Sequence, residues 1–129
     1  MKTIIISIVV VLVIILGALM LTSGKNSQSV VDEPANNVTI VDGKQIIEIK
    51  AKGGYSPYES IAKANMPTII RFNTSGTFDC SSSIRIPKMN ISENLPRSGS
   101  TDIDIGTQPT GLFEGTCGMG MYPFNIKFE

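Results

Sequence analysis

The chain has no histidine and no tryptophan, and only two cysteines among its 129 residues. Without histidine there is no imidazole base for a Ser-His-Asp triad, so hydrolysis by that mechanism is excluded. A blue-copper electron-transfer centre needs two imidazoles and a thiolate and is excluded for the same reason. Two cysteines cannot form a four-thiolate zinc site, and nothing here supplies a convincing catalytic zinc site. We therefore expect that the protein is not an enzyme.

Charge is absent from one long run, "TIIISIVVVLVIILGALMLT", residues 3–22. Twenty residues in a helix span about 30 Å, the hydrocarbon thickness of a bilayer. A cleaved signal peptide is the alternative, but its apolar region is shorter and ends at a small-x-small site, which is not clear here. We predict one uncleaved transmembrane helix, with residues 1–23 as the anchor. Lys2 and Lys25 flank the run equally, so charge counting does not settle its orientation.

The following segment, "GKNSQSVVDEPANN", is polar and lacks periodicity. Its composition predicts a flexible linker over residues 24–37. One domain then occupies residues 38–129, which is long enough for a modest core. From residue 30 onward, nine Lys and Arg face eleven Asp and Glu. This slightly acidic balance gives no basis for nucleic-acid binding or a polybasic membrane patch.

Short alternating runs separated by Gly and Pro dominate the domain. Asp42-Gly43 lies between two apolar stretches and predicts a hairpin, after which Ile47 and Ile49 face inward. Further strands are predicted at "MPTIIRFNT", "SIRIP", "STDIDIGT", "GLFEGTC" and "YPFNIKFE", and one possible helical turn at "YESIAKAN". This spacing is typical of an all-β antiparallel sandwich or small barrel.

Three sulfur-bearing residues crowd together in "TCGMGMYPF", where Cys117, Met119 and Met121 alternate with glycines. The other cysteine, Cys80, lies 37 residues earlier. Two cysteines in a small β domain outside the cytoplasm usually form a structural disulfide. A disulfide, however, does not require methionines two and four positions further on. Most methionines fill gaps in a core, but a glycine-rich loop is a poor place for that role.

The sulfur residues therefore indicate a metal site with Cys80, Cys117, Met119 and Met121 as ligands. Soft thiolate and thioether donors select Cu(I) among common ions. Two thiolates can bridge a pair of ions, so more than one Cu(I) per domain is conceivable. Redox cycling is not expected, because Cu(II) beside two thiolates oxidises them to a disulfide. Such a site holds and transfers an ion.

Four motifs give the chain its resemblance to bacterial copper-binding domains. They are G-x-Y-x-P, a cysteine at a strand end, a Leu-Pro step followed by glycine, and C-x-M-G-M; here they occupy residues 53–57, Cys80, residues 95–99 and residues 117–121. The domain resembles the cupredoxin-like copper-binding domains. With the apolar helix in front, the chain resembles the CupA family, the membrane-anchored Cu(I) chaperones of streptococcal copper-resistance systems.

The resemblance implies a cupredoxin-like β-sandwich or Greek-key barrel with sulfur ligands at one end. It implies thiolate roles for Cys80 and Cys117, and a binuclear Cu(I) site completed by Met119 and Met121. It also implies a copper-exporting P-type ATPase, or its metal-binding domain, as partner, and a single-pass membrane protein whose domain faces the cytoplasm. We expect a monomer.

Two other hypotheses stay open. The first is an extracytoplasmic interaction module stapled by a Cys80–Cys117 disulfide, without metal. The second is a thiol-disulfide oxidoreductase, which the absence of a C-x-x-C pair disfavours. Asp79 and Glu114 flank the cysteines in the sequence; they contribute to docking or ligand support, or are simply solvated surface charges.

Overall fold

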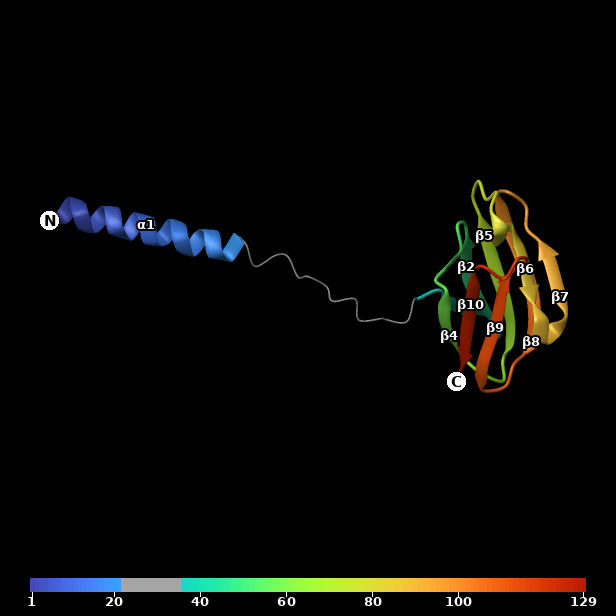
Figure 1. Cartoon of the computed structure of the whole chain (residues 1–129). Coiled ribbons are helices and arrows are strands. Elements are labelled where there is room, and N and C mark those ends of the chain that lie inside the picture. Colours follow the sequence, from blue (N-terminus) through green and yellow to red (C-terminus); the bar gives the residue numbers. More distant parts are fainter. Residues whose placement is uncertain (22–35) are drawn as a thin grey trace. The chain divides into compact units, whose positions relative to one another are not determined.

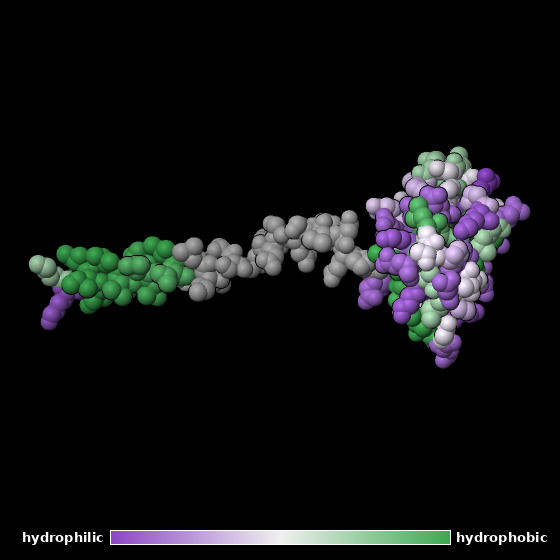
Figure 2. Space-filling view, turned by 90° about the horizontal axis from the view of Figure 1, so that it is seen from below, coloured by the Kyte–Doolittle hydropathy of each residue, from purple (hydrophilic) through white to green (hydrophobic). Residues whose placement is uncertain are grey.

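A computed structural model describes residues 1–21 and 36–129 of the chain. It has two compact units, residues 1–31 and 32–129. In the first, helix α1 (Lys2–Leu21) coincides with the uncharged run, and its visible face is hydrophobic in Figure 2. Within the described residues, no helix combines the length and the apolar character needed to cross a membrane. The transmembrane helix stays a prediction, and the predicted linker, residues 24–37, lies almost entirely outside the described residues.

The second unit contains two five-stranded sheets and two short 3₁₀ turns (Figure 1). One sheet has the order β1-β2-β5-β8, with β3 also paired to β2, and the other has the order β4-β10-β9-β6-β7. The elements are β1 (Val38–Val41), β2 (Lys44–Ala51), β3 (Tyr55–Ser56), β4 (Glu59–Ala62), β5 (Pro67–Thr74), η1 (Cys80–Ser82), β6 (Ser83–Ile86), η2 (Pro87–Met89), β7 (Ile91–Asn94), β8 (Gly99–Thr107), β9 (Gly111–Cys117) and β10 (Pro123–Phe128).

The predicted hairpin is present between β1 and β2, which pair antiparallel. Asp42 and Gly43 both have positive φ, 51° and 75°, as a two-residue turn of this kind requires. Beyond the turn, β2 alternates as predicted, with Ile47 and Ile49 fully buried. The five other predicted strand segments also form strands, namely β5, β6, β8, β9 and β10.

The chain folds mostly into β-sheet, as predicted, but the antiparallel part of the prediction needs correction, because both sheets are mixed. β2 pairs parallel with β5, and β10 pairs parallel with β4. Parallel neighbours need a crossover connection, and the chain provides one by leaving the first sheet after β3, adding β4 to the second sheet and returning as β5. The predicted helical turn at "YESIAKAN" is also wrong. That segment contains β4, where Ser60 and Ala62 are buried and the backbone bonds to β10.

The core lies between the two sheets and draws residues from both. Within this core, the rings of Tyr55, Phe72 and Phe124 meet edge to face, with centroids 5.1–5.9 Å apart. Such arrangements add to the stabilisation from burial alone. Tyr55 also donates a hydrogen bond from its hydroxyl to the backbone oxygen of Ser83, at 3.3 Å. This aromatic cluster thus supports the segment that follows Cys80.

Candidate metal centre

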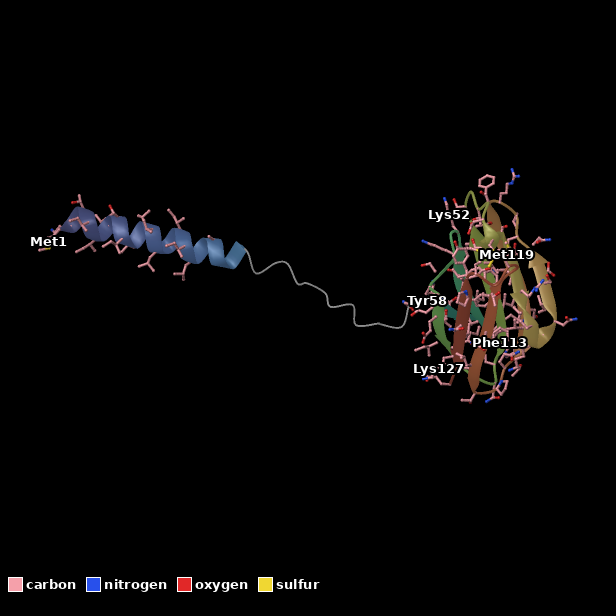
Figure 3. All side chains as sticks on the ribbon, viewed as in Figure 1. Met1, Lys52, Tyr58, Phe113, Met119 and Lys127 are labelled. Carbon is pink, nitrogen blue, oxygen red and sulfur yellow. A yellow bond between two sulfur atoms is a disulfide. The ribbon has the colours of Figure 1, made fainter. Side chains whose placement is uncertain are left out.

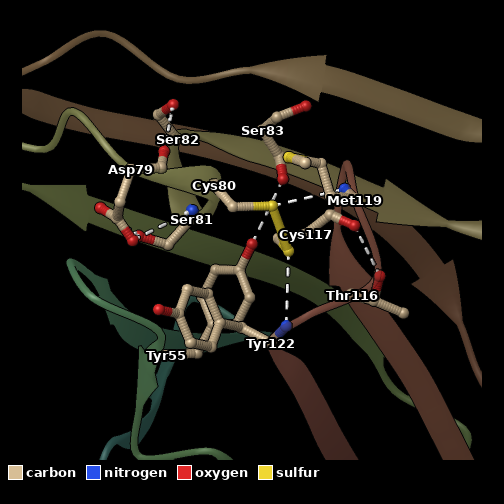
Figure 4. Close-up of a disulfide and its surroundings, with 10 residues drawn as sticks. All are labelled: Tyr55, Asp79, Cys80, Ser81, Ser82, Ser83, Thr116, Cys117, Met119 and Tyr122. Carbon is tan, nitrogen blue, oxygen red and sulfur yellow. Dashed lines mark hydrogen bonds between the residues drawn. A yellow bond between two sulfur atoms is a disulfide. The ribbon is translucent and has the colours of Figure 1, made fainter.

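The two cysteines lie side by side at one end of the sandwich. Cys117 is the last residue of β9, and Cys80 begins the turn η1 that leads into β6. Because β6 pairs with β9, with Ile84 opposite Cys117, the turn before β6 brings Cys80 back against the end of β9. The two Cα atoms are 5.6 Å apart, and the sulfurs are joined in a disulfide (Figure 4). This is the pairing that the metal-free alternative predicts.

Asp79 fixes the turn that carries Cys80. Its carboxylate caps η1 by accepting from the backbone N–H of Ser81 at 3.4 Å and from the Ser81 hydroxyl at 2.9 Å. Burial alone would raise the pKa of Asp79, but the hydrogen bonds from Ser81 and from the backbone of Gly53 together hold that pKa below its usual value. Asp79 therefore stays ionised and supports the position of Cys80. Glu114, the other predicted acidic neighbour, is exposed on β9.

Each sulfur accepts a backbone hydrogen bond from the same loop, residues 118–122. The N–H of Met119 lies 3.3 Å from the Cys80 sulfur, and that of Tyr122 lies 3.4 Å from the Cys117 sulfur (Figure 4). Hydrogen bonds of this type favour the negatively charged form of an acceptor. Two donors are therefore already directed at the atoms that would bear charge as thiolates. Sequence reasoning missed these donors, because backbone N–H groups carry no residue signature.

The backbone geometry of this loop requires glycine at two positions. A Cβ at Gly118 would lie 2.7 Å from the Ser83 hydroxyl oxygen, while the Gly118 N–H donates to the Ser83 carbonyl at 3.0 Å. Gly120 has a φ of 74°, in the left-handed region that glycine occupies without strain. The loop is closed by a bond from the Cys117 N–H to the Tyr122 oxygen, at 2.9 Å.

Exposure increases steeply across the four predicted ligands. Cys117 is fully buried and Cys80 is partly buried, whereas Met119 and Met121 are 78 % and 61 % exposed. In Figure 3, Met119 lies toward the same end of the domain as Lys52, and Lys127 lies toward the other. The structure thus brings the two cysteines together with the backbone of Met119. It places both thioethers on the loop that covers the two cysteines, and both thioethers are exposed to solvent.

The donor set fits a soft, monovalent ion and no harder one. Among the described residues, no group of three or more His, Cys, Asp and Glu side chains could hold a metal ion. Two sulfur ligands of one ion stand within about twice a metal–sulfur bond of roughly 2.3 Å, and a Cα separation of 5.6 Å permits that spacing. Ligation requires the reduced pair, since a disulfide has no thiolate to offer.

A comparison with family models matches residues 11–127 to a family described as cupredoxin-like domain. Among solved structures, the chain is similar to the metal-binding domain of the Cu(I)-exporting P-type ATPase CopA of Streptococcus pneumoniae D39, determined with Cu(I). The identity is 25 %, the TM-score is 0.65, and the match covers 71 % of this chain and 92 % of that domain.

A second similar structure is that of a copper-binding protein in its apo form, with 27 % identity and a TM-score of 0.65. The match covers 71 % of this chain and 94 % of that protein. No curated protein matches the sequence.

Proposed function

Because the chain belongs to the family of cupredoxin-like domains, we propose that it is a Cu(I) carrier and not an enzyme. Cys80 and Cys117 bind the ion as thiolates, and Met119 and Met121 complete the coordination. The observation that carries this proposal is the meeting of two cysteines, 37 residues apart in sequence, beneath a loop with two exposed thioethers. The similarity to a domain determined with Cu(I) supports it.

The exposure gradient suggests how an ion moves. The buried thiolates are the stronger ligands and retain Cu(I), and the exposed thioethers are weaker ligands that an incoming thiolate can displace. In a binuclear arrangement, the second ion is held mainly by Met119 and Met121 and leaves first. The binding form arises when a thiol reductant cleaves the Cys80–Cys117 disulfide, giving two cysteine thiols and one disulfide of the reductant. Cu(I) then displaces the thiol protons.

The partner and the location are further parts of the proposal. A copper-exporting P-type ATPase, or its metal-binding domain, is the acceptor, as in the CupA family, and the outcome is copper resistance. The uncharged run of residues 3–22 attaches the protein to the membrane, with the domain in the reducing cytoplasm. A membrane-impermeant thiol reagent checks this placement. It should label the cysteines only after intact cells are permeabilised, and equal labelling before permeabilisation would refute it.

Anaerobic Cu(I) titration of the reduced full chain tests the binding function. In competition with a chromogenic Cu(I) chelator, the chain should retain Cu(I) and develop thiolate-to-copper absorption. Cys117→Ser should weaken the retention of Cu(I) against the chelator and reduce the absorption, because only one thiolate remains. Met89→Ala removes a sulfur from η2, outside the site, and should behave as the parent chain. Failure of the reduced parent chain to compete with the chelator would disprove the function.

The second candidate function is the metal-free interaction module, which the disulfide itself favours. Counting free thiols in protein taken rapidly from cells separates the two. A copper carrier has two titratable thiols, whereas a stapled module has none until a reductant is added. A structural disulfide that closes a loop of this length typically stabilises a fold by about 2–4 kcal/mol. Reduction should therefore lower the stability of a stapled module by that amount.

A further inference from the structure

One large aromatic side chain at the sulfur end lies outside the core. Phe78 is 74 % exposed, two residues before Cys80 in the loop that follows β5. Phenylalanine and methionine are among the residue types enriched at protein–protein interfaces relative to the rest of the surface. Met119 and Met121 are also largely exposed, and the N–H of Met119 lies 3.3 Å from the sulfur of Cys80. We call Phe78, Met119 and Met121 the contact rim.

The loop that carries Phe78 is rigidly held, so its exposure is built into the fold. Thr77 is buried and donates from its hydroxyl to the Ala51 oxygen at 2.5 Å, and its N–H donates to the Arg97 oxygen at 2.9 Å. The N–H of Gly76 donates to the Ser98 hydroxyl at 2.9 Å. These hydrogen bonds fix the backbone beside Phe78 and keep its ring at the surface.

Two cations lie beside the loop that carries Phe78. The guanidinium carbon of Arg97 lies 4.8 Å from the centroid of Phe78, within the range of a cation–π contact. The ammonium nitrogen of Lys52 lies 4.0 Å from the position that a Cβ would take at Gly76, two residues before Phe78. Within the described residues, neither cation forms an ion pair. The acid nearest in sequence, Asp79, directs its carboxylate to Ser81 and Gly53.

We propose that the contact rim, edged by Arg97 and Lys52, is the docking surface for the protein domain that receives the ion, and that this domain presents carboxylates around its own sulfur ligands. The inference rests on the proposed function. Ligand exchange requires the two sulfur sites to touch, and an apolar rim excludes water from that contact. Arg97 and Lys52, which form no ion pair with any described residue, attract carboxylates and set the orientation, which acts mainly on the rate of association.

The test uses the metal-binding domain of Streptococcus pneumoniae CopA as the acceptor, with the reduced full chain in detergent as the donor. Phe78→Ala should slow Cu(I) transfer to this domain by about tenfold, while removal of the ion by a small chelator keeps the parent rate. Arg97→Gln should slow transfer less and should reduce its dependence on salt. Leu112→Ala is the matched control, since Leu112 is 56 % exposed at the other end of β9.

Docking is also measured without copper, by titrating the reduced metal-free chain into the isotope-labelled acceptor domain and following its NMR shifts. Phe78→Ala should weaken this complex even if the chain proves unable to bind Cu(I), which separates failure of the inference from failure of the proposed function. An unchanged complex would overturn the inference. So would equal slowing of transfer to the domain and to the chelator, because Phe78 would then act on the site itself.

A membrane surface is the competing occupant, since aromatic and cationic side chains also suit anionic lipid. Vesicles containing phosphatidylserine test it directly. If Phe78→Ala weakens vesicle binding and leaves transfer to the acceptor domain unchanged, the docking assignment is wrong.

Discussion

The buried half and the exposed half of the sulfur site are built differently. Cys117 ends a central strand, and Cys80 sits on a capped turn, so packing and hydrogen bonds determine both positions. Met119, Met121 and Phe78 project into solvent from short, tightly bonded loops. Burial gives the first half a fixed geometry, whereas the side chains of the second half are open to solvent. We expect substitutions in the buried half to change stability, and substitutions in the exposed half to change copper binding or transfer.

The largest loss of stability is expected from Gly115→Ala in β9. A Cβ at this position would overlap the outer ring carbons of Phe124, which is fully buried in the aromatic cluster. Overpacking of this kind costs about 1–3 kcal/mol, measured as the free energy of unfolding in urea. Glu114→Ala, on the exposed side of the same strand, is the control and should change stability by less than about 0.5 kcal/mol. Equal stabilities of the two variants would show that the core accommodates the added methyl group at position 115 without cost.

A smaller and pH-dependent loss is expected from Asp79→Asn. The pKa of Asp79 lies below its usual value in the folded chain, so the ionised group stabilises the fold at any pH above the unfolded pKa of about 3.9. This contribution is lost as the pH falls through the lower folded pKa. The variant should therefore be less stable than the parent at pH 7, and the difference should shrink below pH 4. A difference that does not depend on pH would mean that the charge of Asp79 is irrelevant to the turn.

The smallest change in stability is expected from Met119→Ala combined with Met121→Ala. Both side chains are mostly exposed, so the free energy of unfolding should shift by about 0.5 kcal/mol or less. Cu(I) titration should nevertheless reveal weaker binding of one ion, because the proposed site assigns that ion to the thioethers, while the thiolate-bound ion survives. Loss of both ions together would erase the distinction between the two halves of the site.

Much of the domain was predictable from local patterns. The Asp42-Gly43 turn, the inward-facing isoleucines of β2 and five further strands follow from alternation and turn residues, which act over short distances. The parallel pairs could not be read in the same way, because strand direction depends on which sheet the intervening segment joins. The segment with the helical signal became β4 because its backbone groups bond to β10, and tertiary pairing overrides a weak local preference.

The candidate site also has features that the sequence could predict and features that it could not. The sulfur cluster in residues 117–121 and the absence of histidine are properties of composition and spacing, and they limit the chemistry whatever the fold. The roles of Asp79, Phe78 and the N–H of Tyr122 depend on which loops meet at one end of the sandwich. The sequence spacing of Phe78 and Arg97 does not predict their contact. They lie on separate loops, which are joined by the hydrogen bond from the Thr77 N–H to the Arg97 oxygen.

By itself, the sequence determined which candidate donors exist, because side-chain chemistry does not depend on the fold: two thiols, neighbouring thioethers and no imidazole. Only the tertiary structure decided that Cys80 meets Cys117, that backbone donors point at both sulfurs, and that the methionines face solvent. These features arise from the pairing of β6 with β9, a contact between segments distant in the chain that no local pattern encodes.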